Sequence, residues 1–328
     1  MKTKVIMAVF FACIGITIQA QETKTEKPAG KAIVQIFGNF HTGFGAGNDN
    51  RGFELERSYL GYEHELTKGL TIKGIMDFGQ SNHVDDYHRI AYIKNAMVSW
   101  KKGNMTLEGG LIPTTQFGLQ EKFWGYRYIM KSFQDEYKFG NSADLGLSVA
   151  YRFADWISAD AIIVNGEGYK MVQKNDGLNY GLGVTFLPVA GLQIRLYGGW
   201  NESGEADKAN ITNMAAFAGY KNDKFTIGAE YNHMLNASYE RGTDQFGYSF
   251  FASVKLAKIA DVYTRFDGLY SKNNRNNDTD GQTAILGAQF KLGKYVKVAP
   301  NFRIEMPRTA GTHNSCSAYI SCYFGLNN

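Results

Sequence analysis

The stretch GLQIRLYGGW, residues 191–200, decides the fold. Its apolar and polar side chains alternate, with Leu192, Ile194, Leu196 and Trp200 on one side and Gln193, Arg195 and Tyr197 on the other. Successive side chains of a β-strand point to opposite faces of the sheet, so this strand has an apolar face and a face with an arginine at its centre. Such an arginine needs water, either outside a soluble sheet or inside a sheet that closes around a wet interior. The rest of the chain favours the second arrangement.

The composition favours strands and turns over helices. Aromatic residues make up 14% of the 328 residues, and the chain has 37 glycines and 5 prolines. Aromatic residues are enriched in strands. The net charge of +4 is too small to indicate a nucleic-acid partner by itself, and we expect none.

The first twenty residues have the three parts of a secretory signal. Lys2 and Lys4 precede an apolar run from Val5 to Ile16, and the segment ends in Gln19-Ala20. The apolar run is too short to span a membrane comfortably, which favours a signal peptide over an anchor. We therefore predict a cleaved signal peptide over 1–20, a short N-terminal extension over 21–30 and one barrel domain over 31–328.

From Lys31 onward, alternating strands of about ten residues are joined by connections of two kinds. Strand patterns occur at 70–78, 105–112, 178–186, 225–233, 248–256 and 296–306. Short turns such as 67–69, 101–104, 188–191 and 221–224 alternate with long polar loops such as 43–52, 79–88, 165–176 and 271–282. Short turns at one end and long loops at the other, with about sixteen strands, are typical of a bacterial outer-membrane barrel. The predicted fold is all-β, a transmembrane antiparallel β-barrel.

This fold explains why 191–200 has an arginine at the centre of its polar face. In a membrane barrel the apolar face meets lipid and the alternate residues face an interior that can be wet. We expect the following charged strand residues to point into the lumen: Lys73, Asp77, Glu108, Asp160, Arg195, Glu230, Lys255, Arg265, Asp267, Lys297, Arg303 and Glu305. A soluble antiparallel sheet with polar residues facing water is the alternative.

The longest connection, Phe117 to Gly140, differs from the other loops because it is rich in aromatic and charged residues. It lies between the fifth and sixth strands and is the third long loop. A loop of this length with its own apolar residues usually packs somewhere. We predict that it folds against the pore wall and narrows the channel; an external lid or a subunit contact is the alternative.

Several segments together resemble the porin O/P family, the phosphate-selective type of outer-membrane porin. The resemblance lies in FELERSYLGYEHELTKGLTIKG (53–74), EGGLIPTTQFGLQE (108–121), SADLGLSVAYRF (142–153), ISADAIIVNGEGY (157–169) and KVAPNFRIEM (297–306). The resemblance implies a sixteen-stranded barrel, usually trimeric, that passes small anions. It also implies a ladder of inward arginines, with Arg57 at the characteristic arginine of the second strand.

The candidate pore residues are nearly balanced in charge. Arg57, Arg195, Arg265 and Arg303 could form a positive track beside Lys122, Arg127 and Lys131 of the third loop. Glu108, Asp160, Glu230, Asp267 and Glu305 lie near enough in the pattern to pair with that track. Pairing would turn an anion-attracting track into a transverse field, so we expect weak anion selectivity and not a phosphate filter.

No motif indicates an enzyme, a metal site or a cofactor. The sequence has no HExxH and no G-x-S-x-G, and we expect none of the three. Cys316 and Cys322 lie in one predicted strand on one face, at a separation of about 20 Å, which is too far for a disulfide.

We therefore expect an outer-membrane porin for passive diffusion of small hydrophilic solutes, with phosphate-like anions among them. A substrate-specific sugar or peptide channel and a non-conducting structural or adhesin barrel are the alternatives. The expected partners are outer-membrane lipids, lipopolysaccharide, solutes in transit and two further copies in a homotrimer. In IAYIKNAMVSW (90–100) neither face is cleanly apolar, which we interpret as a subunit contact.

Overall fold

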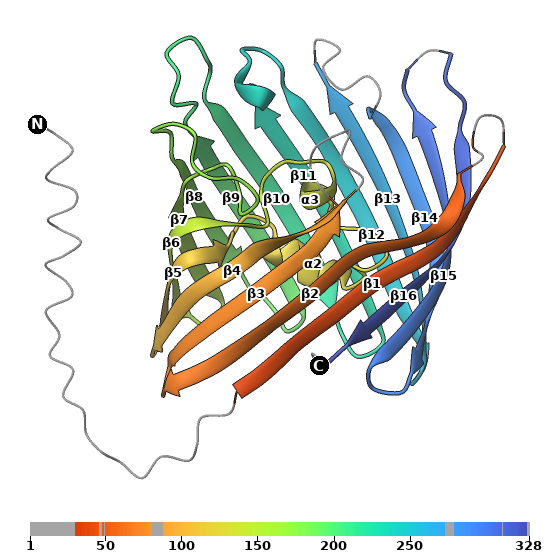
Figure 1. Cartoon of the computed structure of the whole chain (residues 1–328), viewed down its shortest axis with the longest axis horizontal. Helices are drawn as coiled ribbons and strands as arrows, with labels where there is room; N and C mark the ends of the chain where they lie inside the picture. The colour runs from red at the N-terminus through yellow and green to blue at the C-terminus, as the bar shows by residue number, and fades with distance from the viewer. Residues whose placement is uncertain are drawn as a thin grey trace, which may run out of the picture.

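The computed structural model describes residues 30–326, apart from 46, 47, 49, 81–87, 273–278 and 310. These residues form a closed antiparallel barrel of sixteen strands, in which each strand pairs with its sequence neighbours and β1 pairs with β16 (Figure 1). The predicted fold class, strand number and alternation of short turns and long loops are confirmed. The predicted signal peptide and all but the last residue of the extension lie outside the described residues and stay predictions.

The strands agree with the sequence pattern to within a few residues. They are β1 (Gly30–Phe44), β2 (Arg51–Thr67), β3 (Leu70–Gln80), β4 (Arg89–Lys102), β5 (Met105–Pro113), β6 (Ala143–Ala154), β7 (Ile157–Val164), β8 (Asn179–Phe186), β9 (Leu192–Asn201), β10 (Ile211–Lys221), β11 (Phe225–Leu235), β12 (Gln245–Ala257), β13 (Ala260–Ser271), β14 (Gly281–Leu292), β15 (Val296–Pro307) and β16 (Ser315–Gly325).

The outer surface is apolar, as the alternation predicts. In β9, Leu196 is 52% exposed on the outside, whereas the neighbouring Arg195 is 5% exposed. The same alternation places Leu182, Ile227, Phe250 and Leu286 on the outside. Cys316 and Cys322 are free thiols of β16.

The prediction for β4 was wrong in its face assignment. Met76 of β3 pairs with Ile93 and Ile75 pairs with Asn95, so Lys94 is an extra residue that forms a β-bulge. The bulge shifts the alternation by one, and Lys94 and Asn95 both face the interior. The outer face before and after the bulge is therefore apolar, with Ile93 and Val98 exposed. The irregular pattern of 90–100 is a bulge signal and gives no evidence of a subunit contact.

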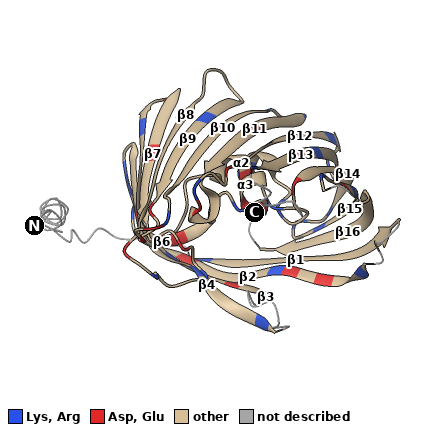
Figure 2. Cartoon of the chain, turned by 90° about the horizontal axis from the view of Figure 1, so that it is seen from above, with Lys and Arg blue, Asp and Glu red and all other residues tan. Residues whose placement is uncertain are grey.

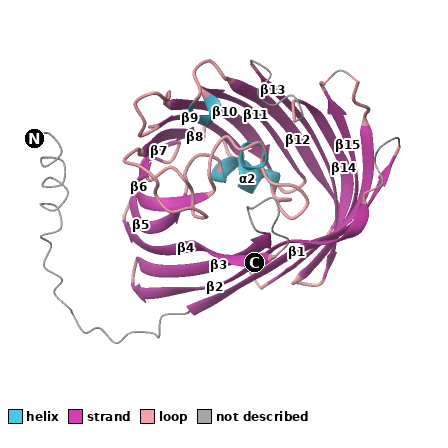
Figure 3. Cartoon of the chain, turned by 45° about the horizontal axis from the view of Figure 1, so that its top comes forward, coloured by secondary structure: helices cyan, strands magenta, loops and turns pink. Residues whose placement is uncertain are grey.

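The segment 114–142 between β5 and β6 folds into the barrel, as predicted, and we call it the constriction loop (Figure 3). It contains α2 (Gly118–Trp124) and the single turn α3 (Phe133–Glu136). Seen from above, both helices lie within the ring of strands (Figure 2).

The constriction loop lies on an aromatic core inside the barrel. Trp124 and Tyr126 pack on Tyr263 of β13, and Tyr128 packs between Phe37 of β1 and Tyr323 of β16. The sequence predicted a wet interior, but this part of the lumen is apolar because inward aromatic residues of several strands bury the loop.

The described residues include no helix that is long and apolar enough to cross a membrane.

Candidate functional site

Arg195, the residue that raised the question of the interior, anchors the start of the constriction loop. Its guanidinium forms a bidentate pair with Asp160 of β7, at 2.6 and 2.9 Å, and donates to the backbone carbonyl of Thr115 at 2.7 Å. Only 5% of its side chain is exposed. Arg195 thus faces the lumen side, but the loop and the aspartate occupy its charge.

Two further arginines hold the middle of the loop. Arg265 forms a bidentate pair with Asp267 on the same strand and donates to the carbonyl of Lys131. Arg303 donates to the carbonyl of Ile129 and lies over the ring of Tyr319 at 3.7 Å. The expected arginine track is therefore largely a set of attachments that hold the constriction loop across the lumen.

Four other cations lie where two cavities meet. One cavity, of about 450 Å³, opens among the constriction loop, the β7–β8 loop and β8–β11. A second, of about 410 Å³, lies against β1, β2 and β14–β16. Both are lined by Arg57, Arg127, Lys131 and Lys170, and we call these four residues the cationic quartet.

The members of the quartet are held by acidic and phenolic neighbours. Arg57 is paired with Asp77 at 2.5 Å, and Lys131 lies 3.5 Å from Glu136. Arg127 contacts Glu121 at 3.3 Å and Asp135 at 3.0 Å.

Two quartet members from loops have shifted pKa values. Burial disfavours the charge of Arg127, but Tyr59, Glu121 and Asp135 outweigh it and raise its pKa. Burial, and next the charge of Arg57, lower the pKa of Lys170. Arg127 is therefore a fixed charge, whereas Lys170 loses its proton at a lower pH than an ordinary lysine.

The sequence prediction missed Tyr169 and Lys170 because the loop 165–178 between β7 and β8 was assigned to the outside. Gly166 and Gly168 have φ of +112° and +83° and bend this loop back into the barrel. The carboxylate of Asp144 accepts hydrogen bonds from both glycine amides. The hydroxyl of Tyr169 then donates to Asp77 and accepts from Arg57.

The second cavity is lined by acidic groups as well as by the quartet. Its described lining includes Glu54, Glu56, Glu136 and Glu305. Glu56 is an extra residue between Leu55 and Arg57 relative to β1, so a bulge places two successive charged side chains near the lumen. The lining of this cavity therefore mixes acidic and basic side chains and is not uniformly positive.

The remaining predicted pore residues lie elsewhere along the interior. Lys255 and Lys297 line a cavity of about 190 Å³ near the short turns. Lys73 pairs with Glu63 at 3.4 Å, and Glu108 lies 3.4 Å from Ser99. Glu230 is buried and accepts from Asn232 at 3.0 Å, whereas Lys122 is exposed on α2.

Among the described residues, no group of three or more His, Cys, Asp or Glu side chains is placed to hold a metal ion.

No family model and no curated protein sequence match this chain. Solved structures do match its fold. An anion-selective porin from Comamonas acidovorans is 12% identical with a TM-score of 0.63, covering 92% of this chain and 100% of that one. OprB of Pseudomonas putida is 11% identical with a TM-score of 0.69, covering 90% and 94%. The trimer form of OmpT, an outer-membrane protein of Vibrio cholerae, is 14% identical with a TM-score of 0.60, covering 92% and 100%. At these identities the likeness shows the fold.

Proposed function

We propose that this protein is an outer-membrane porin through which small hydrophilic solutes diffuse passively. The observation that carries the proposal is a closed barrel whose charged interior cavities share the cationic quartet. Sixteen-stranded barrels of this class leave an aqueous channel, and an apolar outer surface with paired strand edges suits lipid. A passive channel needs no catalytic group, so we propose no enzymatic activity.

Weak anion selectivity is the finer proposal. The quartet supplies positive charge at the narrow part of the interior, but Asp77, Asp135 and the glutamates of the second cavity oppose it. Charge so closely balanced favours anions slightly and orients polar solutes across the lumen. We also propose that phosphate-like anions pass and that the chain belongs to the porin O/P family. The support for both proposals is the sequence motifs.

We further propose a homotrimer in the outer membrane, in contact with lipids and lipopolysaccharide. The support is the sequence resemblance together with the trimer form of the similarly folded OmpT. The irregular pattern of β4 no longer contributes to this proposal.

Planar-bilayer recording of the refolded protein tests the function. We expect stepwise conductance increases from protein whose folding is verified by heat-modifiable gel migration, and a native mass of three chains in detergent. A folded protein that gives no conductance steps would favour the structural or adhesin barrel and overturn the proposal. Recording with neutral sugars and peptides in the bath separates a general porin from a substrate-specific channel, because only the latter is blocked at low solute concentration.

A further inference from the structure

The 450 Å³ cavity on the long-loop side of the constriction loop has a polar wall whose hydrogen-bonding capacity is not used up. Asn179, Asn201 and Asn213 come from the adjacent strands β8, β9 and β10 and line the cavity together with Glu167. Asn213 is only 8% exposed, and its Oδ1 has no hydrogen-bond partner among the described residues. The Oδ1 of Asn201 and one carboxylate oxygen of Glu167 are also buried without such a partner.

Unpartnered buried acceptors are costly, and a protein retains them where something else supplies the donor. The three atoms are all oxygens, two amide and one carboxylate, so a ligand that pairs with all three donates several hydrogen bonds. Vicinal hydroxyl groups of a sugar present donors in several directions from one rigid ring.

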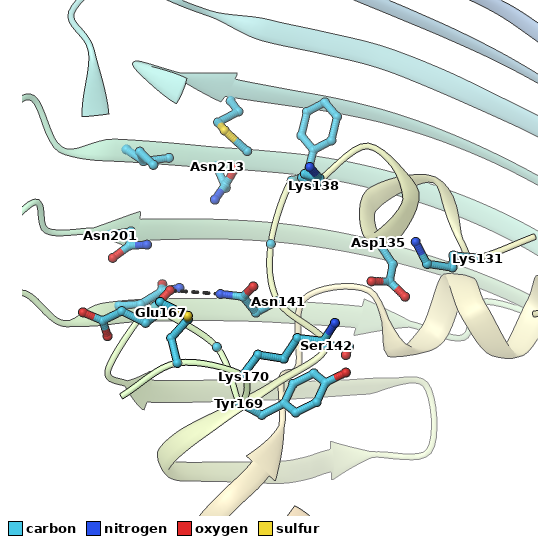
Figure 4. Close-up of a pocket in the computed structure, with 18 of the residues that line it drawn as sticks. Lys131, Asp135, Lys138, Asn141, Ser142, Glu167, Tyr169, Lys170, Asn201 and Asn213 are labelled. Carbon is cyan, nitrogen blue, oxygen red and sulfur yellow. Dashed lines mark hydrogen bonds between the residues drawn. The ribbon is translucent and has the colours of Figure 1, made fainter. Parts of the chain in front are cut away.

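The cavity is electrically asymmetric. Asn201 and Glu167 lie toward one side, whereas Lys131 and Asp135 lie toward the other (Figure 4). Five cations line the cavity with two acidic residues, Asp135 and Glu167, and Asp135 is paired with Arg127. The cations are Arg57, Arg127, Lys131, Lys138 and Lys170. A ligand that is complementary to both sides of the cavity carries hydroxyl groups at one end and an anionic group at the other.

The size of the cavity agrees with a small ligand, because sites for small molecules enclose about 300–1,000 Å³. The rings of Tyr169 and Tyr239, together with Ile211, Met171 and Met234, supply apolar surface for the faces of a sugar ring. The cavity is open on the long-loop side of the barrel, where a solute from outside the cell would arrive first.

We propose that this cavity is a binding subsite for sugar acids, with the hydroxyl groups on Asn201, Asn213 and Glu167 and the carboxylate toward the cationic quartet. The inference rests on the proposed function, since it names a solute class that the channel concentrates before passage. It predicts saturable binding on the long-loop side, beyond the weak selectivity of the pore as a whole.

Calorimetric titration of the folded protein with glucuronate, glucose and glycylglycine tests the subsite. Glucuronate and glucose differ only in the carboxylate, and we expect glucuronate to bind about tenfold more tightly. Asn213→Ala should weaken glucuronate binding about fivefold through loss of one hydrogen bond. Lys170→Gln should weaken glucuronate without changing glucose.

The control variant is Asn104→Ala, since Asn104 lies exposed in the short β4–β5 turn. It should bind glucuronate as the unchanged protein does. Equal affinity for glucose and glucuronate, or tighter binding of glycylglycine, would overturn the sugar-acid assignment. Conductance without glucuronate binding refutes this inference alone, whereas glucuronate binding without conductance refutes only the proposed function.

Discussion

At the scale of single residues, the inward arginines illustrate how a buried charge is retained. Arg265 and Asp267 are each 1% exposed, and both oxygens of the aspartate accept from the guanidinium. Removing either partner leaves an uncompensated charge, which costs far more than the pair itself contributes. The guanidinium also reaches the carbonyl of Lys131 and lies 5.2 Å from the ring of Trp124. The pair therefore links the barrel wall to the constriction loop.

We predict that Arg265→Gln lowers the free energy of unfolding by about 3–5 kcal/mol, measured by denaturant unfolding in lipid vesicles. The double variant Arg265→Gln/Asp267→Asn should lose less than the single one, because no charge is left unpaired. A double variant that is less stable than Arg265→Gln by the full cost of Asp267→Asn would show that the two side chains act independently.

At the scale of elements, strands were predictable and side-chain partners were not. Strict alternation over β8, β9 and β11 determines which face is apolar without any tertiary information. In β4 the same rule failed at Lys94, because a bulge changes the alternation and the irregular pattern it leaves in the sequence was interpreted as a subunit contact. The aromatic content of 117–140 predicted a packed loop, and Trp124 and Phe133 are indeed buried.

The pairing of Arg195 with Asp160 could not be predicted, because it depends on the register of β7, β8 and β9. The loop containing Tyr169 was missed for a related reason. Its sequence reads as an ordinary glycine-containing polar loop, and only the contact with Asp77, ninety-two residues earlier, shows that it enters the barrel. The sequence feature that could have indicated an inward loop is the tyrosine directly after Gly168.

The packing of the constriction loop gives a prediction at this scale. Trp124 is 2% exposed, donates to the carbonyl of Met130 at 2.8 Å and contacts Phe251 and Tyr263 of the wall. Trp124→Ala should destabilise the docked loop by about 3–5 kcal/mol. The expected results are faster trypsin cleavage within 122–131 and noisier single-channel currents, with heat-modifiable migration retained.

Trp156→Ala is the matched control. Trp156 is 56% exposed in the turn between β6 and β7, so its removal opens no cavity. Cleavage rates that rise equally in both variants would mean that the constriction loop is not held by the packing of Trp124.

At the scale of the whole molecule, the proposed channel has one set of cations that hold the constriction loop and another that would act on passing ions. Arg195 and Arg265 are buried beneath the constriction loop, whereas Lys131 has 36% of its side chain exposed. Ions that cross the proposed channel would therefore meet Lys131 more directly than the anchoring arginines. The potential along the pore should depend on where a charge lies and not on the total number of inward arginines.

This separation predicts how ion selectivity responds to mutation. Lys131→Gln/Lys170→Gln should shift the reversal potential toward cations and lower the anion-to-cation permeability ratio about two- to fivefold. The size follows from a Coulomb interaction of about 1 kcal/mol at 4 Å in water, and the shift should shrink at high salt.

Lys68→Gln, in the exposed β2–β3 turn, is the charge-matched control and should leave the potential unchanged. Arg195→Gln should change it less than the double variant does, because its charge is neutralised by Asp160. A larger shift in Arg195→Gln, with the constriction loop still protected from trypsin, would place Arg195 in the ion path and contradict its assignment as an anchor.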